Sequence, residues 1–252
     1  MYRRRFEAHA ASETLTIYSQ EVKDSFVIRI KKPLNFSPDS SYQIIYTADG
    51  SLKLGNYIIG TDSSWSAEIP SDCIIVTIAH IGDWHTKRQR DFLPSDAGGY
   101  KDENFAQALN FYLFLKNTVI PLVNEKLVNR KRTAFIGHSF SGLFCLYTLF
   151  QEDKLFDYHF AISPSVWANH GELMKIERKY FESTRELYAK VELQAGGLEF
   201  LNKVLSSTKE FYKTTKSRNY NGYEVDFSTV NNANHYSIIK PGVDKALKSL
   251  AD

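Results

Sequence analysis

The sequence has no long apolar segment and no recognisable secretory signal. No apolar run approaches the roughly 20 residues that a membrane-spanning helix requires. The basic N-terminus, Met1 to Glu7, is not followed by the apolar stretch and small-residue cleavage site of a signal peptide. We therefore expect a cytoplasmic protein with no membrane partner.

Cysteine and net charge are also scarce. The 252 residues include 31 Lys and Arg against 29 Asp and Glu, a balance that gives no general reason to expect nucleic acid as a partner. The two cysteines, Cys73 and Cys145, lie in apolar runs, which favours buried reduced thiols over a disulfide. No H-E-x-x-H or C-x-x-C spacing occurs, so we expect no metal.

Nothing in the chain divides it into parts. Its length fits one large α/β domain or two small ones, but it contains no internal repeat and no linker rich in Pro, Gly or Ser. We therefore expect a single domain over residues 1–252.

Strand-like and helix-like segments alternate along most of the chain. Residues 14–20 and 25–31 alternate in polarity and predict an antiparallel pair, whereas 42–47 and 73–78 are nearly continuous apolar runs that suit strands buried on both faces. A helical pattern covers 104–126, where Pro121 is expected to kink or split it. From residue 133, strands near 133–136, 158–162, 190–194 and 223–227 are each followed by a helix, near 140–151, 171–181, 199–214 and 240–250. The order predicts a mostly parallel, doubly wound sheet with an antiparallel N-terminal edge.

A cluster of small residues stands between the strand at 133–136 and the following helix: Gly137-His138-Ser139-Phe140-Ser141-Gly142. Such a strand, sharp turn and helix are typical of the nucleophile turn of an α/β-hydrolase, where backbone strain lifts a serine hydroxyl from the sheet edge. Ser139 is our candidate nucleophile. The pattern G-x-S-x-G is not met, because Ser141 stands where the second glycine is expected, and ordinary turn chemistry is the competing interpretation.

A base and an acid follow Ser139 in the chain order of this fold. His235 lies in a polar loop directly after the last expected strand and is the candidate base, with a surface histidine as the alternative. Glu199 follows the strand at 190–194 and is the candidate acid that orients the imidazole, with a helix-terminal glutamate as the alternative. Asp226 is a weaker candidate within a strand, and a Ser-His dyad stays open.

Backbone N–H groups and basic side chains complete the candidate site. The N–H of Phe140 is one expected oxyanion donor, and the N–H of Ser51, in the loop after residues 42–47, is the second. The basic run from His85 to Arg90 follows the strand at 73–78. It is either a solvated loop or a recognition segment for an anionic substrate, in which His85, Arg88 and Arg90 would take part.

With these residues in view, the chain resembles an esterase branch of the α/β-hydrolases over residues 14–250. That branch includes enterochelin-type siderophore esterases, S-formylglutathione hydrolases, feruloyl esterase domains and mycolyltransferases. The motifs that carry the resemblance are the strand ending in Asp49-Gly50, the segment Arg88-Gln-Arg-Asp-Phe-Leu-Pro94, Ser163-Pro-Ser165, Gly196-Gly-Leu-Glu199 and Asn234-His235.

The resemblance implies a serine esterase without a cofactor that acts on a small-molecule ester through Ser139, His235 and Glu199. The basic segment makes the siderophore-esterase branch the best match, in which the substrate is a catechol-amide triester that is anionic when bound to iron. Arg88 or Arg90 would match that charge. Two alternatives stay open: acyl transfer on the same fold, and a catalytically silent binding module in which Ser141 disrupts the nucleophile turn.

Overall fold

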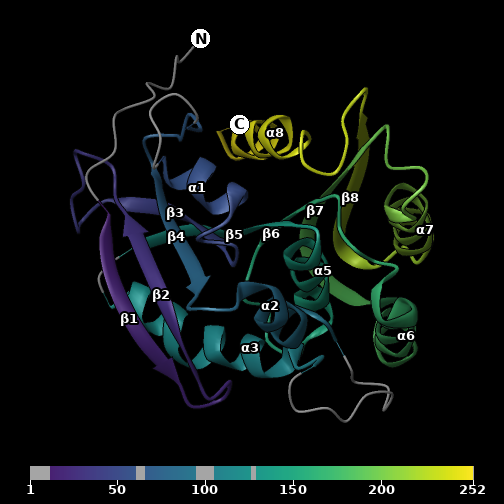
Figure 1. Cartoon of the computed structure of the whole chain (residues 1–252), viewed down its shortest axis with the longest axis horizontal. Helices are drawn as coiled ribbons and strands as arrows, with labels where there is room; N and C mark the ends of the chain where they lie inside the picture. Colours follow the sequence, from purple (N-terminus) through teal and green to yellow (C-terminus); the bar gives the residue numbers. More distant parts are fainter. Residues whose placement is uncertain (1–11, 61–65, 95–104, 126–128, 252) are drawn as a thin grey trace.

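The computed structural model describes residues 12–60, 66–94, 105–125 and 129–251. Within these ranges eight strands form one sheet in the order β1-β2-β4-β3-β5-β6-β7-β8 (Figure 1). The strands are β1 (Glu13–Ser19), β2 (Asp24–Lys31), β3 (Ser41–Thr47), β4 (Cys73–His80), β5 (Asn129–His138), β6 (Tyr158–Ile162), β7 (Glu186–Gly196) and β8 (Asn221–Val230).

Strand direction follows the expectation from sequence. β1 pairs antiparallel with β2, and β2 pairs antiparallel with β4, whereas every other neighbouring pair is parallel. The predicted mostly parallel sheet with an antiparallel N-terminal edge is therefore confirmed. Because β3 to β8 run in the same direction, the segments that follow them meet along one edge of the sheet.

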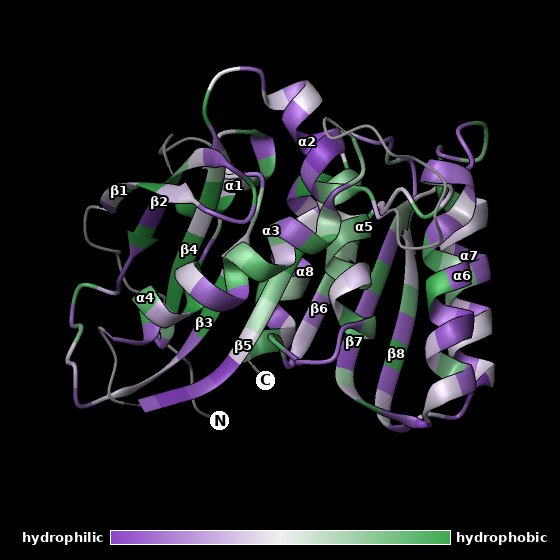
Figure 2. Ribbon diagram, turned by 90° about the horizontal axis from the view of Figure 1, so that it is seen from below, coloured by the Kyte–Doolittle hydropathy of each residue, from purple (hydrophilic) through white to green (hydrophobic). Residues whose placement is uncertain are grey.

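Helices cover both faces of this sheet (Figures 1 and 2). They are α1 (Lys53–Ile59), α2 (Trp84–Phe92), α3 (Ala108–Phe114), α4 (Ile120–Asn124), α5 (Phe140–Tyr147), α6 (Ala168–Ser183), α7 (Val204–Ser217) and α8 (Ile239–Ala251). The apolar faces of α1 and α8 pack into one core cluster, and those of α3, α5, α6 and α7 pack into another.

Strand β3 shows why the apolar runs are continuous. Ile44 and Tyr46 point into the larger cluster, and Ile45 between them points into the cluster under α1 and α8. All three side chains have no exposed surface. Successive side chains of a strand face opposite sides, so a strand covered on both sides needs an apolar residue at every position.

The helical segment that contains Pro121 is divided. α3 ends at Phe114, a π-helical turn covers Leu115–Val119, and α4 begins at Ile120 with Pro121 in its first turn. Proline lacks the N–H that an α-helix needs in its interior, and the wide turn places it where that donor is not required. Residues 104 and 126, the limits of the predicted helix, lie outside the described residues.

Three other features differ from the sequence reading. Residues 84–92 form α2 and not a loop, because the Asp83 carboxylate accepts hydrogen bonds from the N–H groups of His85 and Thr86 and caps the helix. α7 begins at Val204, five residues later than expected, and α1 was not foreseen.

Cys73 and Cys145 are buried free thiols, as predicted. None of the helices in the described ranges has the length and apolar character that crossing a bilayer requires.

Candidate active site

Ser139 stands at the sharp turn between β5 and α5. Its backbone has φ 61° and ψ −117°, a conformation that is costly for a residue with a side chain. A side chain at Gly137 would not fit, because a Cβ there would lie 2.2 Å from the carbonyl oxygen of Ser141. Ser139 N–H donates to the Ile162 carbonyl oxygen at 3.1 Å, which ties the turn to β6. The strained turn expected for a serine nucleophile is therefore present.

Ser141 occupies the glycine position without disrupting the turn. Its hydroxyl is fully buried and donates to Asp49 Oδ2 at 2.5 Å. Ser141 Oγ also accepts a hydrogen bond from the His138 N–H at 2.9 Å. The hydroxyl thus links the nucleophile turn to the loop after β3, a function that glycine could not perform.

His235 lies within hydrogen-bond distance of both proposed partners. Its Nε2 is 2.9 Å from Ser139 Oγ, and its Nδ1 is 2.6 Å from Glu199 Oε1. The loop after β8 is shaped by Asn234, whose side-chain oxygen accepts from the N–H groups of Tyr236 and Ser237, each at 2.9 Å. The structure therefore brings together three residues that are 96 and 36 positions apart in the chain.

Glu199 is held by neutral donors at its second oxygen. Oε2 accepts from Ser163 Oγ at 2.5 Å and from the Gly196 N–H at 2.6 Å, and only 2% of the residue is exposed. Burial raises the pKa of Glu199, but the hydrogen bonds with His235, Ser163 and Gly196 outweigh it and leave the pKa below its usual range. The carboxylate is therefore charged where it faces His235.

The Ser163-Pro-Ser165 motif supports the site from β6. Ser163 has a positive φ of 43° and supplies the hydroxyl that binds Glu199. Ser165 places its Oγ 3.3 Å from that of Ser139, and its N–H donates to the Ser139 carbonyl oxygen at 3.1 Å. From the sequence, this motif could be recognised only as part of the family resemblance. The contacts of its hydroxyls could not be predicted, because their partners come from distant segments.

His138 contacts the candidate site, although the sequence analysis assigned it no role there. Its ring is tilted by 43° relative to that of His235, with 4.6 Å between centroids, and its Nε2 is 2.7 Å from the His235 carbonyl oxygen. A carbonyl only accepts, so Nε2 carries a proton. Burial lowers the pKa of His138 to about 4, and the neighbouring His235 is the second largest cause of this decrease. The neutral ring therefore holds the backbone of His235 without adding charge.

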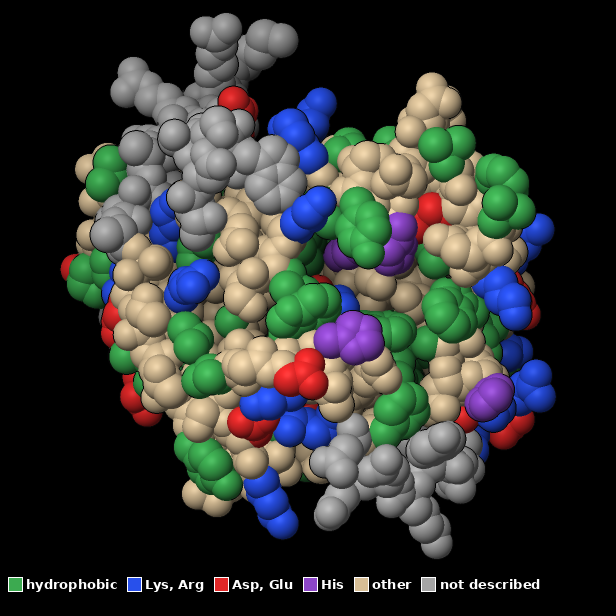
Figure 3. All heavy atoms as spheres, viewed as in Figure 1, with side chains coloured by type: hydrophobic (Ala, Val, Ile, Leu, Met, Phe, Trp, Pro, Cys, Tyr) green, Lys and Arg blue, Asp and Glu red, His purple; other side chains and the backbone are tan. Residues whose placement is uncertain are grey.

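A cavity of about 290 Å³ opens beside Ser139. It is lined by residues from the segments that follow β3, β4, β5 and β8: Asp49, Leu52, Lys53, Leu54, Trp84, Arg88, His138, Ser139, His235, Tyr236 and Ile239. Figure 3 shows histidine side chains near the middle of this face, with hydrophobic and basic side chains around them. An ester carbonyl in the cavity would lie within reach of the serine.

The two expected oxyanion donors border the site in different ways. The N–H of Phe140 is the first of α5, and the first N–H groups of a helix have no partner inside it. Ser51 lies between lining residues Asp49 and Leu52 but does not line the cavity itself. The N–H groups on either side of Ser51 donate to other carbonyls, Gly50 to Ile78 at 2.9 Å and Leu52 to Asp49 at 3.0 Å.

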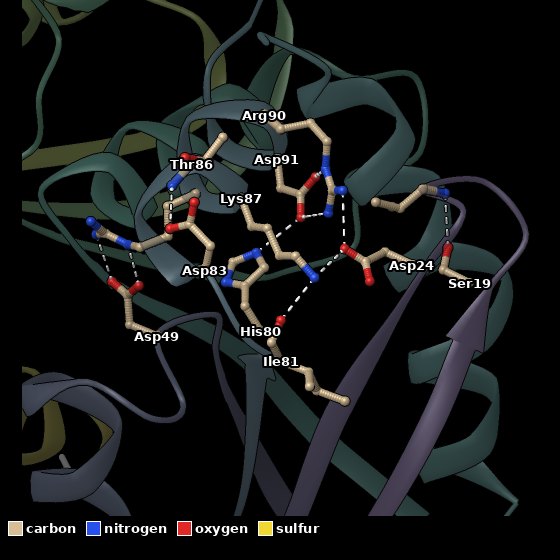
Figure 4. A network of polar contacts seen from close by, with 12 residues as sticks. Ser19, Asp24, Asp49, His80, Ile81, Asp83, Thr86, Lys87, Arg90 and Asp91 are labelled. Atoms are coloured by element: carbon tan, nitrogen blue, oxygen red, sulfur yellow. Dashed lines mark hydrogen bonds and ion pairs between the residues drawn. The ribbon is translucent and has the colours of Figure 1, made fainter. Parts of the chain in front are cut away.

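Arg88 and Arg90 face different parts of the molecule. Arg88 lines the cavity, but its guanidinium forms a two-point ion pair with Asp49, with N–O distances of 2.6 and 3.1 Å. Arg90 binds Asp91 at 2.6 and 2.9 Å and Asp24 at 3.0 Å, in a network that includes His80 (Figure 4). The structure does not support the prediction that Arg90 contacts substrate.

His85 and Asp226 also lie away from the cavity lining. His85 is exposed at the start of α2, where its ring packs against Trp84 with 5.7 Å between centroids. Asp226 lies inside β8, paired in register with Glu192 of β7. Among the residues that the structure describes, no group of three or more His, Cys, Asp or Glu side chains could hold a metal ion.

Comparisons with known proteins identify relatives over most of the chain. Residues 19–227 match the family described as "Putative esterase". The chain is 24% identical over 255 residues to the ferri-bacillibactin esterase BesA of Bacillus subtilis, which covers 94% of this chain and 88% of that protein. It is 27% identical over 176 residues to the siderophore triacetylfusarinine C esterase of Aspergillus fumigatus, covering 65% of this chain and 59% of that protein.

Solved structures share the fold. The BES protein from Bacillus cereus superposes with a TM-score of 0.77 and 23% identity over 98% of both chains. The siderophore hydrolase EstB from Aspergillus nidulans superposes with a TM-score of 0.73 and 21% identity, over 95% of this chain and 94% of that one. The architecture is the α/β-hydrolase fold, as predicted.

Proposed function

Because this chain belongs to the "Putative esterase" family and is a carboxylic ester hydrolase, we propose that Ser139, His235 and Glu199 are its nucleophile, base and acid. The observation that supports the assignment most is the hydrogen-bonded series from Ser139 Oγ through His235 to Glu199, at 2.9 and 2.6 Å, beside an open cavity. Segments following four strands, β3, β5, β7 and β8, supply the triad and the oxyanion donors of this proposal, which assigns the activity to a single domain.

In the proposed reaction, His235 Nε2 takes the proton of Ser139 as its Oγ attacks the ester carbonyl carbon. Glu199 accepts the Nδ1–H and stabilises the imidazolium that forms. His235 then gives the proton to the departing alkoxide, which leaves an acyl-serine. Water attacks this intermediate with His235 again as base, and the carboxylic acid leaves as Ser139 regains its proton.

The oxyanion of each tetrahedral intermediate binds to the N–H groups of Phe140 and Ser51 in this proposal. One such donor contributes about 3 kcal/mol to transition-state stabilisation. Phe140 qualifies because its N–H begins α5, where the helix dipole also favours negative charge. Ser51 qualifies because it follows Gly50 in the loop after β3, next to the cavity lining.

The proposed substrate class is a small siderophore-type ester, of which a catecholate trilactone is the first example to test. The names of the relatives support this class, since they describe esterases of ferri-bacillibactin and triacetylfusarinine C. The cavity also fits a small ester in size.

The test is hydrolysis by the wild type and by Ser139→Ala at pH 8, with 4-nitrophenyl butyrate and a catecholate trilactone as substrates. We expect free carboxylic acid from both esters and a loss of at least about 10³-fold in kcat in the variant. An unchanged kcat in Ser139→Ala would remove Ser139 from the mechanism. Turnover of the simple ester without the trilactone would contradict the substrate class alone.

A further inference from the structure

Two cationic side chains line the cavity, and they differ in whether a neighbouring carboxylate compensates their charge. The Arg88 charge is compensated by Asp49, which binds it through both carboxylate oxygens. Lys53 lines the same cavity, and no carboxylate among the described residues pairs with it. With one carboxylate and two cations in the lining, the uncompensated positive charge of the cavity belongs to Lys53.

Tyr236 orients this free cation. The Lys53 ammonium lies 5.4 Å from the centroid of the Tyr236 ring, within cation–π distance. Tyr236 follows the proposed base directly, and its backbone N–H is fixed by Asn234. The contact therefore couples the position of the ammonium to the loop that carries His235.

Exposed aromatic surface continues this wall of the cavity. Tyr236 is 66% exposed and Trp84, from the start of α2, is 43% exposed, although both line the cavity. Large aromatic side chains that stay exposed beside a cation offer an apolar surface and a charge to the same ligand. The basic side chains next to the central histidines are visible in Figure 3.

We propose that Lys53, positioned by Tyr236, selects esters that carry a negative charge near the scissile bond, and that Arg88 does not make this selection. The inference rests on the proposed function, because it assigns charge specificity to the same cavity. Arg88 is instead a structural cation, since removing it would leave Asp49 buried without its main partner. Lys53 is exposed and free to approach an anionic group of the substrate.

The experiment compares two esters of equal chain length, 4-nitrophenyl hexanoate and mono-4-nitrophenyl adipate. They differ only in the terminal group, which is a methyl in the first and a carboxylate in the second. The quantity measured is the ratio of kcat/KM for the adipate ester to kcat/KM for the hexanoate ester. We expect Lys53→Met to lower this ratio about tenfold, mainly through a higher KM for the adipate ester.

Four further variants test whether the effect is a general structural one. Lys53→Arg should keep the ratio close to that of the wild type. Lys240→Met removes an exposed lysine that is paired with Asp244 outside the cavity lining, and should also leave the ratio unchanged. Tyr236→Leu should lower the ratio and Tyr236→Phe should preserve it, because only the ring is needed to orient the ammonium.

The outcomes separate the two proposals. If Lys53→Met has the wild-type ratio while both esters are hydrolysed through Ser139, the charge-selection proposal is wrong and the esterase assignment stands. If the wild type hydrolyses neither ester nor the trilactone, the proposed function fails, and this inference fails with it.

Discussion

Among the described residues, two histidine–carboxylate pairs have similar distances and different surroundings. His235 Nδ1 lies 2.6 Å from Glu199, and His80 Nε2 lies 2.9 Å from Asp91. His235 uses its second ring nitrogen to contact Ser139, and 24% of its side chain is exposed. The His80 side chain is only 3% exposed, and its ring packs against Phe26 and Phe92.

The two carboxylates are compensated differently. Asp91 receives a two-point ion pair from Arg90, whereas Glu199 receives neutral donors from Ser163 and Gly196 besides His235. The negative charge of Glu199 is therefore available to stabilise an imidazolium, while that of Asp91 is already neutralised. A short histidine–carboxylate distance does not identify a catalytic pair; the second ring nitrogen and access to a cavity distinguish it.

The largest expected difference between the pairs concerns the histidines. His235→Ala should lower kcat for 4-nitrophenyl butyrate by roughly four to six orders of magnitude, as loss of the base does in serine hydrolases. His80→Ala should keep kcat within about threefold and lower the urea midpoint, because it deletes a buried hydrogen bond to Asp91 and leaves a cavity beside Phe26 and Phe92. A loss of kcat of similar size in both variants would contradict the distinction.

Replacement of the carboxylates should give the next largest effect. Glu199→Gln should reduce kcat by about 10² to 10⁴-fold, because an amide can donate to Nδ1 and favour the wrong tautomer of His235. Asp91→Asn should reduce stability and leave kcat nearly intact, since Arg90 would lose a charged partner. Steady-state kinetics and urea unfolding on both proteins make the comparison, and normal turnover in Glu199→Gln would favour a Ser-His dyad.

Ser141 offers a smaller and sharper test, because its hydroxyl links the turn that carries Ser139 to Asp49 and makes no contact with the His80–Asp91 pair. Ser141→Gly restores the residue that the nucleophile motif calls for but deletes the hydroxyl that binds Asp49. We expect about a threefold to tenfold loss in kcat for both Ser141→Gly and Ser141→Ala, with a loss of about 1–3 kcal/mol in unfolding free energy. Full activity in the glycine variant would show that only small size matters at this position.

The smallest expected effect is in the pH dependence of stability. The pKa of Glu199 is lowered in the folded protein, so its contribution to stability is complete above its unfolded pKa. That contribution disappears as pH falls through the lowered folded pKa. The unfolding free energy of Glu199→Gln should therefore depend less on pH below about 5 than that of the wild type. Parallel curves for the two proteins would contradict the lowered pKa.

The parts of the site that the sequence predicted follow from local rules. Ser139, His235 and Glu199 each follow a strand, and parallel strands bring such positions to one edge. Arg88 and Arg90 could not be separated in this way. Residues 84–92 form a helix, in which side chains two positions apart point to nearly opposite sides. The sequence analysis took this segment as a loop, for which the directions of the side chains could not be predicted.

The supporting residues depended on long-range contacts. Asp49 binds Ser141 across 92 positions of sequence, and the ring of His138 reaches the His235 backbone across 97. No local pattern encodes either contact, because the partners meet only when β3, β5 and the loop after β8 are assembled. The same holds for Lys53, which belongs to the unforeseen helix α1.

The measurement that tests the central claim most directly is covalent labelling with a fluorophosphonate, followed by mass spectrometry of the peptides. We predict one adduct per chain, on the peptide that contains Ser139, and loss of labelling in His235→Ala with labelling retained in His80→Ala. An adduct on another residue, or labelling that survives in His235→Ala at the wild-type rate, would contradict the proposed site.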